Sequence, residues 1–239
     1  MNSADRVKEI EQLASGKSEE EALRLIQKQF DRKVTFSTSF GLEDQVITHL
    51  VFSNNIPINI FTLDTGRNFN ETYSVWSRTI DIYKKNIEVF FPKTETVENL
   101  LKQKGPFSFY ESVENRTECC FIRKVEPLKR ALNGYEVWIT GIRKEQSSNR
   151  NNMESVEWDD QHKLVKFHPL FDWSEKKVKD FISKNNIPYN SLHDQGFPSI
   201  GCQPCTRAIK EGEDVRSGRW WWEGNTKKEC GLHNTTAAT

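Results

Sequence analysis

The feature that most constrains the fold is a repeated alternation of short β-rich runs with helical segments between residues 34 and 184. Strands that alternate with helices pair in parallel and connect through right-handed crossovers. The sequence therefore predicts an α/β fold with a parallel sheet and flanking helices. The expected strands are 34–37, 58–62, 87–91, 137–140 and 164–167.

Helical signals separate these runs. Residues 4–30 read as two helices, because Ser18 and Glu21 have the spacing of a capping box and an apolar stripe follows them. The pair Cys119-Cys120 is expected to open a helix that runs to residue 132, and Ser174 to cap a helix that runs to residue 184. The other expected helices are 43–52, 70–84 and 97–102, and the expected irregular segments are 149–157 and 185–201.

The carboxyl ends of the expected strands carry small and polar loops. Ligands of parallel sheets bind at these ends. The loop 37–41 suits a phosphate or sulfate group, since hydroxyls, backbone N–H groups and a helix N-terminus all favour an anion. An ordinary strand–helix turn explains the same residues equally well, and the Lys-Ser/Thr ending of the common P-loop is missing. The candidate binding residues here are Ser37, Ser39, Phe40, Gly41, Leu63, Asp64, Thr65, Gly66, Gly141 and Arg143.

Four of the five cysteines form two tight pairs, Cys119-Cys120 and Cys202-Gln203-Pro204-Cys205. A two-residue gap lets two thiolates converge on one metal centre, whereas adjacent side chains converge only with a particular backbone turn. Spacing alone favours zinc over an iron–sulfur cluster, because structural zinc commonly uses two-Cys knuckles. Both remain open at this point.

The fifth cysteine, Cys230, has no local partner and lies near His233 in a polar C-terminal stretch. The tail alone favours an incidental surface thiol. With the other four thiols assigned to one centre, Cys230 becomes a candidate nucleophile and His233 a candidate cation or proton donor. We expect residues 1–33 to form N-terminal helices, 34–210 the α/β domain and 211–239 a mobile tail.

Charge and composition exclude some function classes. Lys plus Arg and Asp plus Glu both number 34, which argues against a general nucleic-acid or membrane-surface binder. An anion site must then come from local cations, for which the candidates are Lys124, Arg143, Arg150, Arg216 and Arg219. No apolar run is long enough to span a bilayer, and the polar N-terminus lacks a signal-peptide core. We therefore expect a cytoplasmic protein with reduced thiols.

Four motifs together carry a resemblance to a known family. They are Glu118-Cys119-Cys120-X-X-Arg123-Lys124, Gly201-Cys202-X-X-Cys205, Arg216-X-X-Arg219-Trp220-Trp221-Trp222 and Lys228-Glu229-Cys230-Gly231-Leu232-His233. In this order they closely resemble the assimilatory adenylyl-sulfate (APS) reductases, within the wider phosphoadenylyl-sulfate (PAPS) reductase family. The resemblance spans residues 34–233.

The resemblance implies a Rossmann-like, adenine nucleotide alpha hydrolase-like fold of the ATP-pyrophosphatase (PP-loop) type. It implies one 4Fe-4S cluster per chain on Cys119, Cys120, Cys202 and Cys205, which reverses the spacing-only preference for zinc. It also implies that Cys230 is the nucleophile. The first loop reads Ser-Thr-Ser-Phe-Gly where ATP pyrophosphatases have Ser-Gly-Gly, which fits a sulfonucleotide site better than ATP hydrolysis.

The expected reaction is reduction of adenylyl sulfate to sulfite and AMP through a Cys230 S-sulfonate, as part of sulfate assimilation and cysteine biosynthesis. The reductant is expected to be a separate thioredoxin or glutaredoxin-like protein, because the chain ends six residues beyond His233 with no further Cys-X-X-Cys. Alternatives are PAPS or dual specificity, a PP-loop RNA-modifying enzyme, and a zinc-organised binding module. No nucleic acid or membrane partner is expected, and a homo-oligomer stays open.

Overall fold

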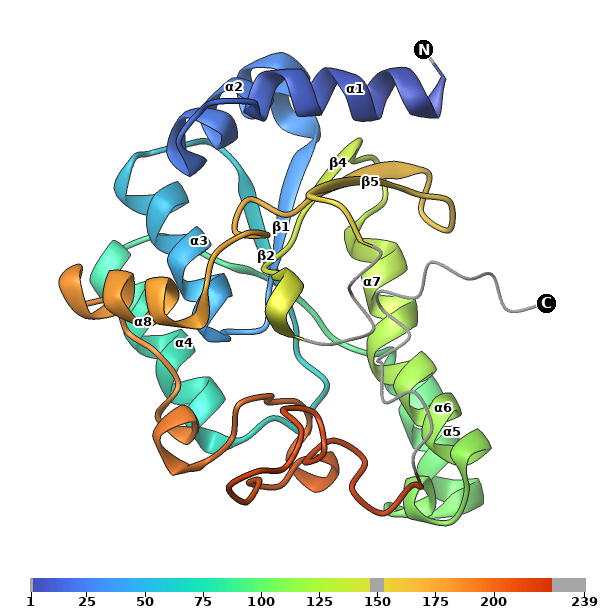
Figure 1. Ribbon diagram of the computed structural model, residues 1–239. Coiled ribbons are helices and arrows are strands. Elements are labelled where there is room, and N and C mark those ends of the chain that lie inside the picture. Colours follow the sequence, from blue (N-terminus) through green and yellow to red (C-terminus); the bar gives the residue numbers. More distant parts are fainter. Residues whose placement is uncertain (1, 147–152, 225–239) are drawn as a thin grey trace. The chain divides into compact units, whose positions relative to one another are not determined.

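The structure is a computed structural model that describes residues 2–146 and 153–224 (Figure 1). The helices in this part are α1 (Ser3–Ala14), α2 (Glu19–Phe30), α3 (Leu42–Ser53), α4 (Asn70–Tyr83), α5 (Thr94–Lys104), α6 (Val113–Cys120), α7 (Glu126–Ala131) and α8 (Glu175–Lys184). The strands are β1 (Val34–Thr38), β2 (Asn59–Leu63), β3 (Glu88–Phe90), β4 (Val137–Ile139), β5 (Val156–Asp159) and β6 (Leu164–Phe167).

The shorter helical turns are the 3-10 segments η1 (Asp31–Lys33), η2 (Ser108–Tyr110), η4 (Lys144–Gln146), η6 (Ser191–Gln195) and η7 (Gln203–Cys205), together with the π-helical turn η3 (Phe121–Val125). No helix among the described residues is long and apolar enough to cross a membrane.

The strands form one six-stranded sheet in the order β3-β2-β1-β4-β6-β5. The strand β1 pairs in parallel with β2 and β4, and β4 pairs in parallel with β6, whereas β5 is antiparallel to β6. This mostly parallel sheet with its flanking helices confirms the predicted α/β class.

The chain divides into two compact units, each built from several segments. Unit 1 comprises residues 1–62, 70–88 and 134–191, and unit 2 comprises residues 63–69, 89–133 and 192–239. The predicted domain boundaries at residues 33 and 210 stay a prediction.

Unit 1 holds the large apolar core. Phe36 of β1 and Ile139 of β4 are fully buried, and apolar faces of the helices pack onto the same cluster. In this unit α3 packs against β1 and α8, and α1 packs against β5 and β6. The capping box that starts α2 is present, because Ser18 and Glu21 bond each other's backbone N–H groups.

Unit 2 is organised around a helical run in which α6, η3 and α7 follow one another without a break. The turn η2 packs on α6, and α5 packs on η3. Its smaller apolar cluster joins Leu100, Phe109 and Trp220 with the buried thiols Cys119 and Cys205. The cysteines of this unit are therefore part of its core.

Most predicted elements are confirmed with ends shifted by a few residues, and two predictions are wrong. The pair Cys119-Cys120 ends α6 and does not open a helix, because the helix already starts at its N-cap Ser112. The segment predicted as loop up to residue 157 contains the start of β5. Val156 is 1% exposed there and pairs with Phe167. Burial of this side chain in the sheet thus stabilises a strand that the polar residues around it do not predict.

Candidate functional site

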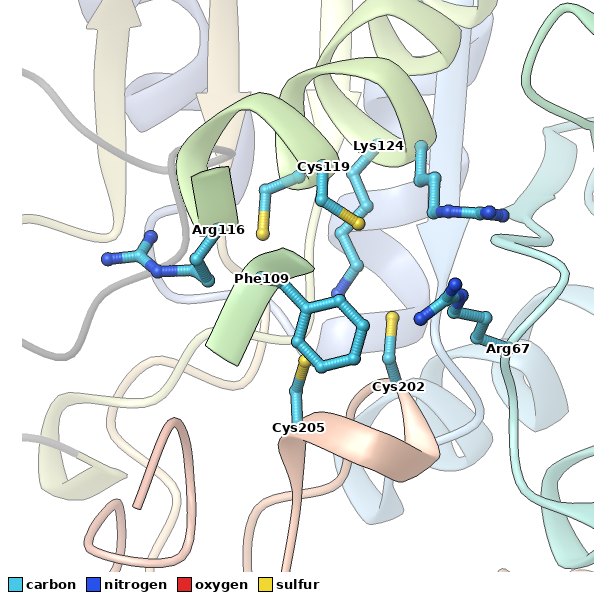
Figure 2. Close-up of a pocket in the computed structure, with 9 residues that line it drawn as sticks. Arg67, Phe109, Arg116, Cys119, Lys124, Cys202 and Cys205 are labelled. Carbon is cyan, nitrogen blue, oxygen red and sulfur yellow. The ribbon is translucent and has the colours of Figure 1, made fainter. Parts of the chain in front are cut away.

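Four free thiols line one pocket in unit 2 (Figure 2). The pocket has about 300 Å³ of empty space, part of it open to solvent. Its lining consists of Cys119, Cys120, Cys202 and Cys205, the cations Arg67, Arg116, Arg123 and Lys124, and the ring of Phe109. The structure thus brings together the two cysteine pairs that the sequence separates by more than eighty residues.

The backbone after the first pair departs from the α-helix. Cys119 and Cys120 are the last residues of α6, and the π-helical turn η3 follows at once. A π turn adds one residue to a helical turn, so it changes which side chains share a face, and such turns are frequent at functional sites. It also brings the next cations, Arg123 and Lys124, to the pocket wall.

The second pair is shaped by the turn η7. The N–H of Cys205 donates to the carbonyl of Cys202 at 3.0 Å, which closes the turn between the two thiols. The N–H of Gln203 donates to the carbonyl of Arg67 at 2.8 Å, and the hydroxyl of Tyr110 donates to the carbonyl of Pro204 at 2.6 Å. Three separate backbone contacts therefore hold this thiol pair at the pocket.

The thiols differ in their acidity. Burial works to raise the pKa of Cys202, but Lys124, the Thr65 hydroxyl and two arginines hold it below its ordinary value. Burial and the neighbouring thiols raise the pKa of Cys205 to about 12, and burial raises the pKa of Cys119. Thiols this close together resist ionisation because their negative charges would repel one another. A bound metal centre would overcome this and bind them as thiolates.

Buried arginines surround the thiols. Nη1 of Arg123 donates to the Thr65 carbonyl at 2.6 Å, and its Nε is buried with no hydrogen-bond partner. Nη1 of Arg219 lies within hydrogen-bond reach of Ser199 and Ile200, and its guanidinium carbon lies 4.9 Å from the centre of the Trp220 ring. The fixed positive charges of Arg123 and Arg219 favour the binding of an anion in unit 2.

The loop after β2 contributes to this pocket through Thr65. The Cys202 sulfur lies 3.3 Å from the Thr65 hydroxyl oxygen. Asp64 is buried and accepts the N–H of Gly66 at 2.9 Å. Gly66 has a φ of +69°, and a side chain there would touch Phe91 and Arg123, so the position suits glycine. Leu63, the first residue of the predicted site loop, ends β2.

In unit 1 the predicted site residues lie around the ends of β1 and β4. The Ser37 hydroxyl accepts from the Trp138 indole at 2.8 Å, and the buried ring of Phe40 stacks on Trp76. Gly41 is the N-cap of α3. The guanidinium of Arg143 donates to Glu43 at 2.7 Å and to the Trp173 carbonyl at 3.1 Å. Its charge is thus already used within the protein.

Three predicted site residues, Arg150, Cys230 and His233, lie outside the described residues, as do residues 225–239 of the predicted tail 211–239. Arg216 is described, and its N–H donates to Asp214 at 2.8 Å within a turn.

Sequence reasoning missed the pocket residues Arg67, Phe109 and Arg116. Arg67 directly follows the glycine loop, and Arg116 stands four positions before Cys120 on α6, where helical spacing places two side chains on one face. The position of Arg67 and the helical spacing of Arg116 could therefore have identified both residues from the sequence. Nothing in the sequence marks Phe109, which reaches the pocket through the fold of η2.

Within residues 2–146 and 153–224, no group of three or more His, Cys, Asp or Glu side chains is arranged to hold a metal ion. The four thiols surround the pocket and do not converge on one point. As a donor set they match the four thiolates that hold an iron–sulfur cluster.

This mostly parallel sheet and its flanking helices define a Rossmann-like α/β protein. The chain belongs to the family of the phosphoadenosine phosphosulfate reductase domain, whose model matches residues 33–208. It is similar to the adenosine 5'-phosphosulfate reductase of Neisseria meningitidis serogroup B, with 50% identity over 203 residues, covering 84% of this chain and 82% of that protein. It is also similar to the protein of that name from Allochromatium vinosum, with 50% identity over 200 residues, covering 84% and 78%.

Among solved structures, the phosphoadenylyl-sulfate reductase of Candida auris matches with a TM-score of 0.74 and 28% identity, covering 87% of this chain and 98% of that one. The FMN adenylyltransferase of Candida glabrata shares the fold at a TM-score of 0.55 and 15% identity, covering 100% of this chain and 81% of that one.

Proposed function

We propose that the chain is an adenylyl-sulfate reductase, which converts adenylyl sulfate to sulfite and AMP with two electrons from an external dithiol protein. The observation that carries the proposal is the unit 2 pocket, which gathers four thiols and four cationic side chains. Two relatives with 50% identity and the name adenosine 5'-phosphosulfate reductase support the choice of substrate.

The proposed cofactor is one 4Fe-4S cluster per chain, held by Cys119, Cys120, Cys202 and Cys205. The four thiols line one pocket without converging on a point, whereas a single zinc ion needs its ligands to converge within a few ångströms, and this supports a cluster over zinc. When bound, the cluster supplies a fixed charge and a covalent link between the two cysteine pairs.

The proposed chemistry takes place on Cys230. Its thiolate attacks the sulfonyl sulfur of adenylyl sulfate, an S–S bond forms, and the S–O bond to the phosphate breaks as AMP leaves with the electron pair. A thiolate of the reductant then attacks the sulfur of Cys230, and sulfite leaves with the S–S electron pair. The second thiol of the reductant releases Cys230, so the reductant ends as a disulfide and Cys230 is regenerated.

Cations would assist both steps. An ordinary cysteine has a pKa near ~8.5, and positive charge nearby raises its thiolate fraction at neutral pH. The same charges would stabilise the sulfate and the departing AMP. Lys124, Arg216, Arg219 and His233 are the proposed groups. The remaining proposed substrate-binding residues are Ser37, Ser39, Phe40, Gly41, Leu63, Asp64, Thr65, Gly66, Gly141, Arg143 and Arg150.

Further parts of the proposal rest on the sequence. Thioredoxin or a glutaredoxin-like protein is the proposed reductant, and the cytoplasm is the proposed compartment because the reaction needs reduced thiols. PAPS as a second substrate is an outcome of the test below.

The deciding experiment is turnover of APS and PAPS in parallel, with thioredoxin supplied and sulfite measured. We expect sulfite from APS. Absence of sulfite from both nucleotides, in protein whose pocket is loaded, would overturn the function.

Two variants separate the proposed roles. Cys230→Ser should lose sulfite formation and keep visible absorption, iron content and nucleotide binding. Cys202→Ser should lose iron and absorption, since it removes a pocket thiol. A colourless wild-type protein with stoichiometric zinc would contradict the cluster, and full activity of Cys230→Ser would contradict the nucleophile.

A further inference from the structure

Arg116 joins the thiol pocket of unit 2 to residues 220–223, near the end of the described chain. Its Nε and Nη2 donate to the two carboxylate oxygens of Glu223 at 2.8 and 3.0 Å, and its guanidinium carbon lies 4.8 Å from the centre of the Trp220 ring. The same side chain hydrogen-bonds Cys120, one helical turn further along α6. Arg116 and Cys120 both line the pocket. One guanidinium therefore contacts a pocket thiol and this segment at the same time.

The segment 220–223 also contacts the second thiol pair. The N–H of Trp220 donates to the Cys205 carbonyl at 3.1 Å, and Trp220 is 1% exposed. The N–H of Glu223 donates in turn to the Trp220 carbonyl at 2.9 Å, which closes a turn. The segment is thus held at the second pair by its backbone and at the first pair through Arg116.

The strength of the contact between Arg116 and Cys120 depends on what the pocket holds. A thiol is a weak hydrogen-bond acceptor, whereas a metal centre binds cysteine as the thiolate. A hydrogen bond between charged groups is about twice as strong as a neutral one. In the loaded pocket the guanidinium consequently lies between two anions, the Cys120 sulfur and the Glu223 carboxylate. In metal-free protein only the carboxylate attracts it with a full charge.

We propose that Arg116 is a positioning residue that couples loading of the thiol pocket to the docking of the segment 220–223 on α6. Such coupling is reciprocal, so loading holds the segment more tightly and the docked segment makes the pocket retain its metal longer. The inference rests on the proposed function, because Glu223 stands seven positions before the proposed nucleophile Cys230. Arg116 acts by placing the chain that leads to this nucleophile.

The first test compares amide hydrogen exchange in iron-loaded and chelator-treated protein. The reporter is the Glu223 N–H, whose bond lies within the segment. We expect loading to slow its exchange at least about fivefold, the lower end of typical couplings between two sites. Arg116→Lys should lose most of this effect, because lysine keeps the charge but has no planar fork to bond Glu223 and Cys120 together. Arg130→Lys is the matched control and should keep the effect. Arg130 also bonds a glutamate, Glu126, at 3.0 and 3.2 Å, and is not among the described residues that line the pocket.

The second test uses the reciprocity and measures the half-life of iron release to a chelator. Glu223 is not among the described residues that line the pocket, yet Glu223→Gln should shorten this half-life at least about fivefold. The same substitution should have a much smaller effect in the Arg116→Lys background, because its link to the pocket is already broken there. Glu223→Gln also replaces Arg116→Lys in the first test if the lysine variant does not fold.

Equal slowing of exchange in wild type, Arg116→Lys and Arg130→Lys would overturn the proposal, as would iron release that Glu223→Gln leaves unchanged. A wild-type protein that holds no iron would overturn it as well. Neither measurement uses turnover. Sulfite formation without this coupling would therefore refute the inference alone, and the coupling without sulfite formation would refute the proposed function alone.

Discussion

Removing the ion pair between Arg116 and Glu223 is expected to destabilise unit 2 strongly. The pair is bidentate, with N–O distances of 2.8 and 3.0 Å, and its side chains are only 14% and 7% exposed. The Arg116 guanidinium also lies over the ring of Trp220, 4.8 Å from its centre. One arginine thus joins α6, the pocket wall and the segment that leads toward Cys230.

The size of the effect follows from burial. Breaking a buried pair by removing one partner costs roughly 3–5 kcal/mol, because the other charge stays buried. Partial exposure of Arg116 favours the lower end, and the lost contact with Trp220 adds about 1 kcal/mol. We expect Arg116→Ala to cost about 4 kcal/mol and Glu223→Gln about 2–3 kcal/mol. Arg116→Lys should cost about 1–2 kcal/mol, since it keeps the charge and loses the fork.

The assay is urea unfolding of Arg116→Ala, of Glu223→Gln and of the double variant that combines them. Unfolding is followed by tryptophan fluorescence and by far-UV circular dichroism. Coincident transitions would justify two-state free energies. The double-mutant cycle should give a coupling energy above about 1 kcal/mol. A coupling below about 0.5 kcal/mol, the range found for independent sites, would refute the argument that this pair stabilises the unit.

Three more predictions concern unit 1. Asp159→Asn should cost about 3 kcal/mol in urea unfolding, because Lys166 is 1% exposed and loses the carboxylate that lies 2.9 Å away; a cost below about 1 kcal/mol would contradict this. Burial raises the pKa of Asp44 from an ordinary 3.8 to about 6, so its ionisation opposes folding in full above about pH 6, and the penalty is lost as the pH falls from about 6 toward 3.8. Wild type should therefore gain about 2–2.5 kcal/mol relative to Asp44→Asn between pH 8 and pH 4, and a pH-independent difference would contradict the burial argument. Gly141→Ala should cost about 1–3 kcal/mol in thermal unfolding, because a Cβ atom there would lie 2.3 Å from Oδ1 of Asp44, and adding Asp44→Ser should restore part of the loss. Absence of any rescue would mean that the clash lies elsewhere.

Local signals in the sequence predicted most of the elements and the gathering of the paired cysteines, but they missed β5 and the start of α6. The capping box of Ser18 and Glu21, the β-rich run at Val34 and the N-cap Ser174 each act within one turn or one strand, so they can be read without the fold. The two tight cysteine pairs predicted one thiol centre, and the pocket brings all four together. Residues 147–152 and 225–239 lie outside the described part, so the roles of Arg150, Cys230 and His233 stay predictions.

Tertiary structure decided which charges remain available to a ligand. Arg143 looked like a ligand group in the sequence, but Glu43, a hundred positions earlier, holds it. Ser39 looked like an anion donor, yet Asp44 takes both of its hydrogen atoms. Arg116 meets Glu223 across 107 positions. The sequence shows which side chains can donate or accept hydrogen bonds or carry a charge, because these properties belong to each residue by itself. Whether a side chain's hydrogen bonds and charge are satisfied within the protein depends on its burial and on partners that only folding brings near.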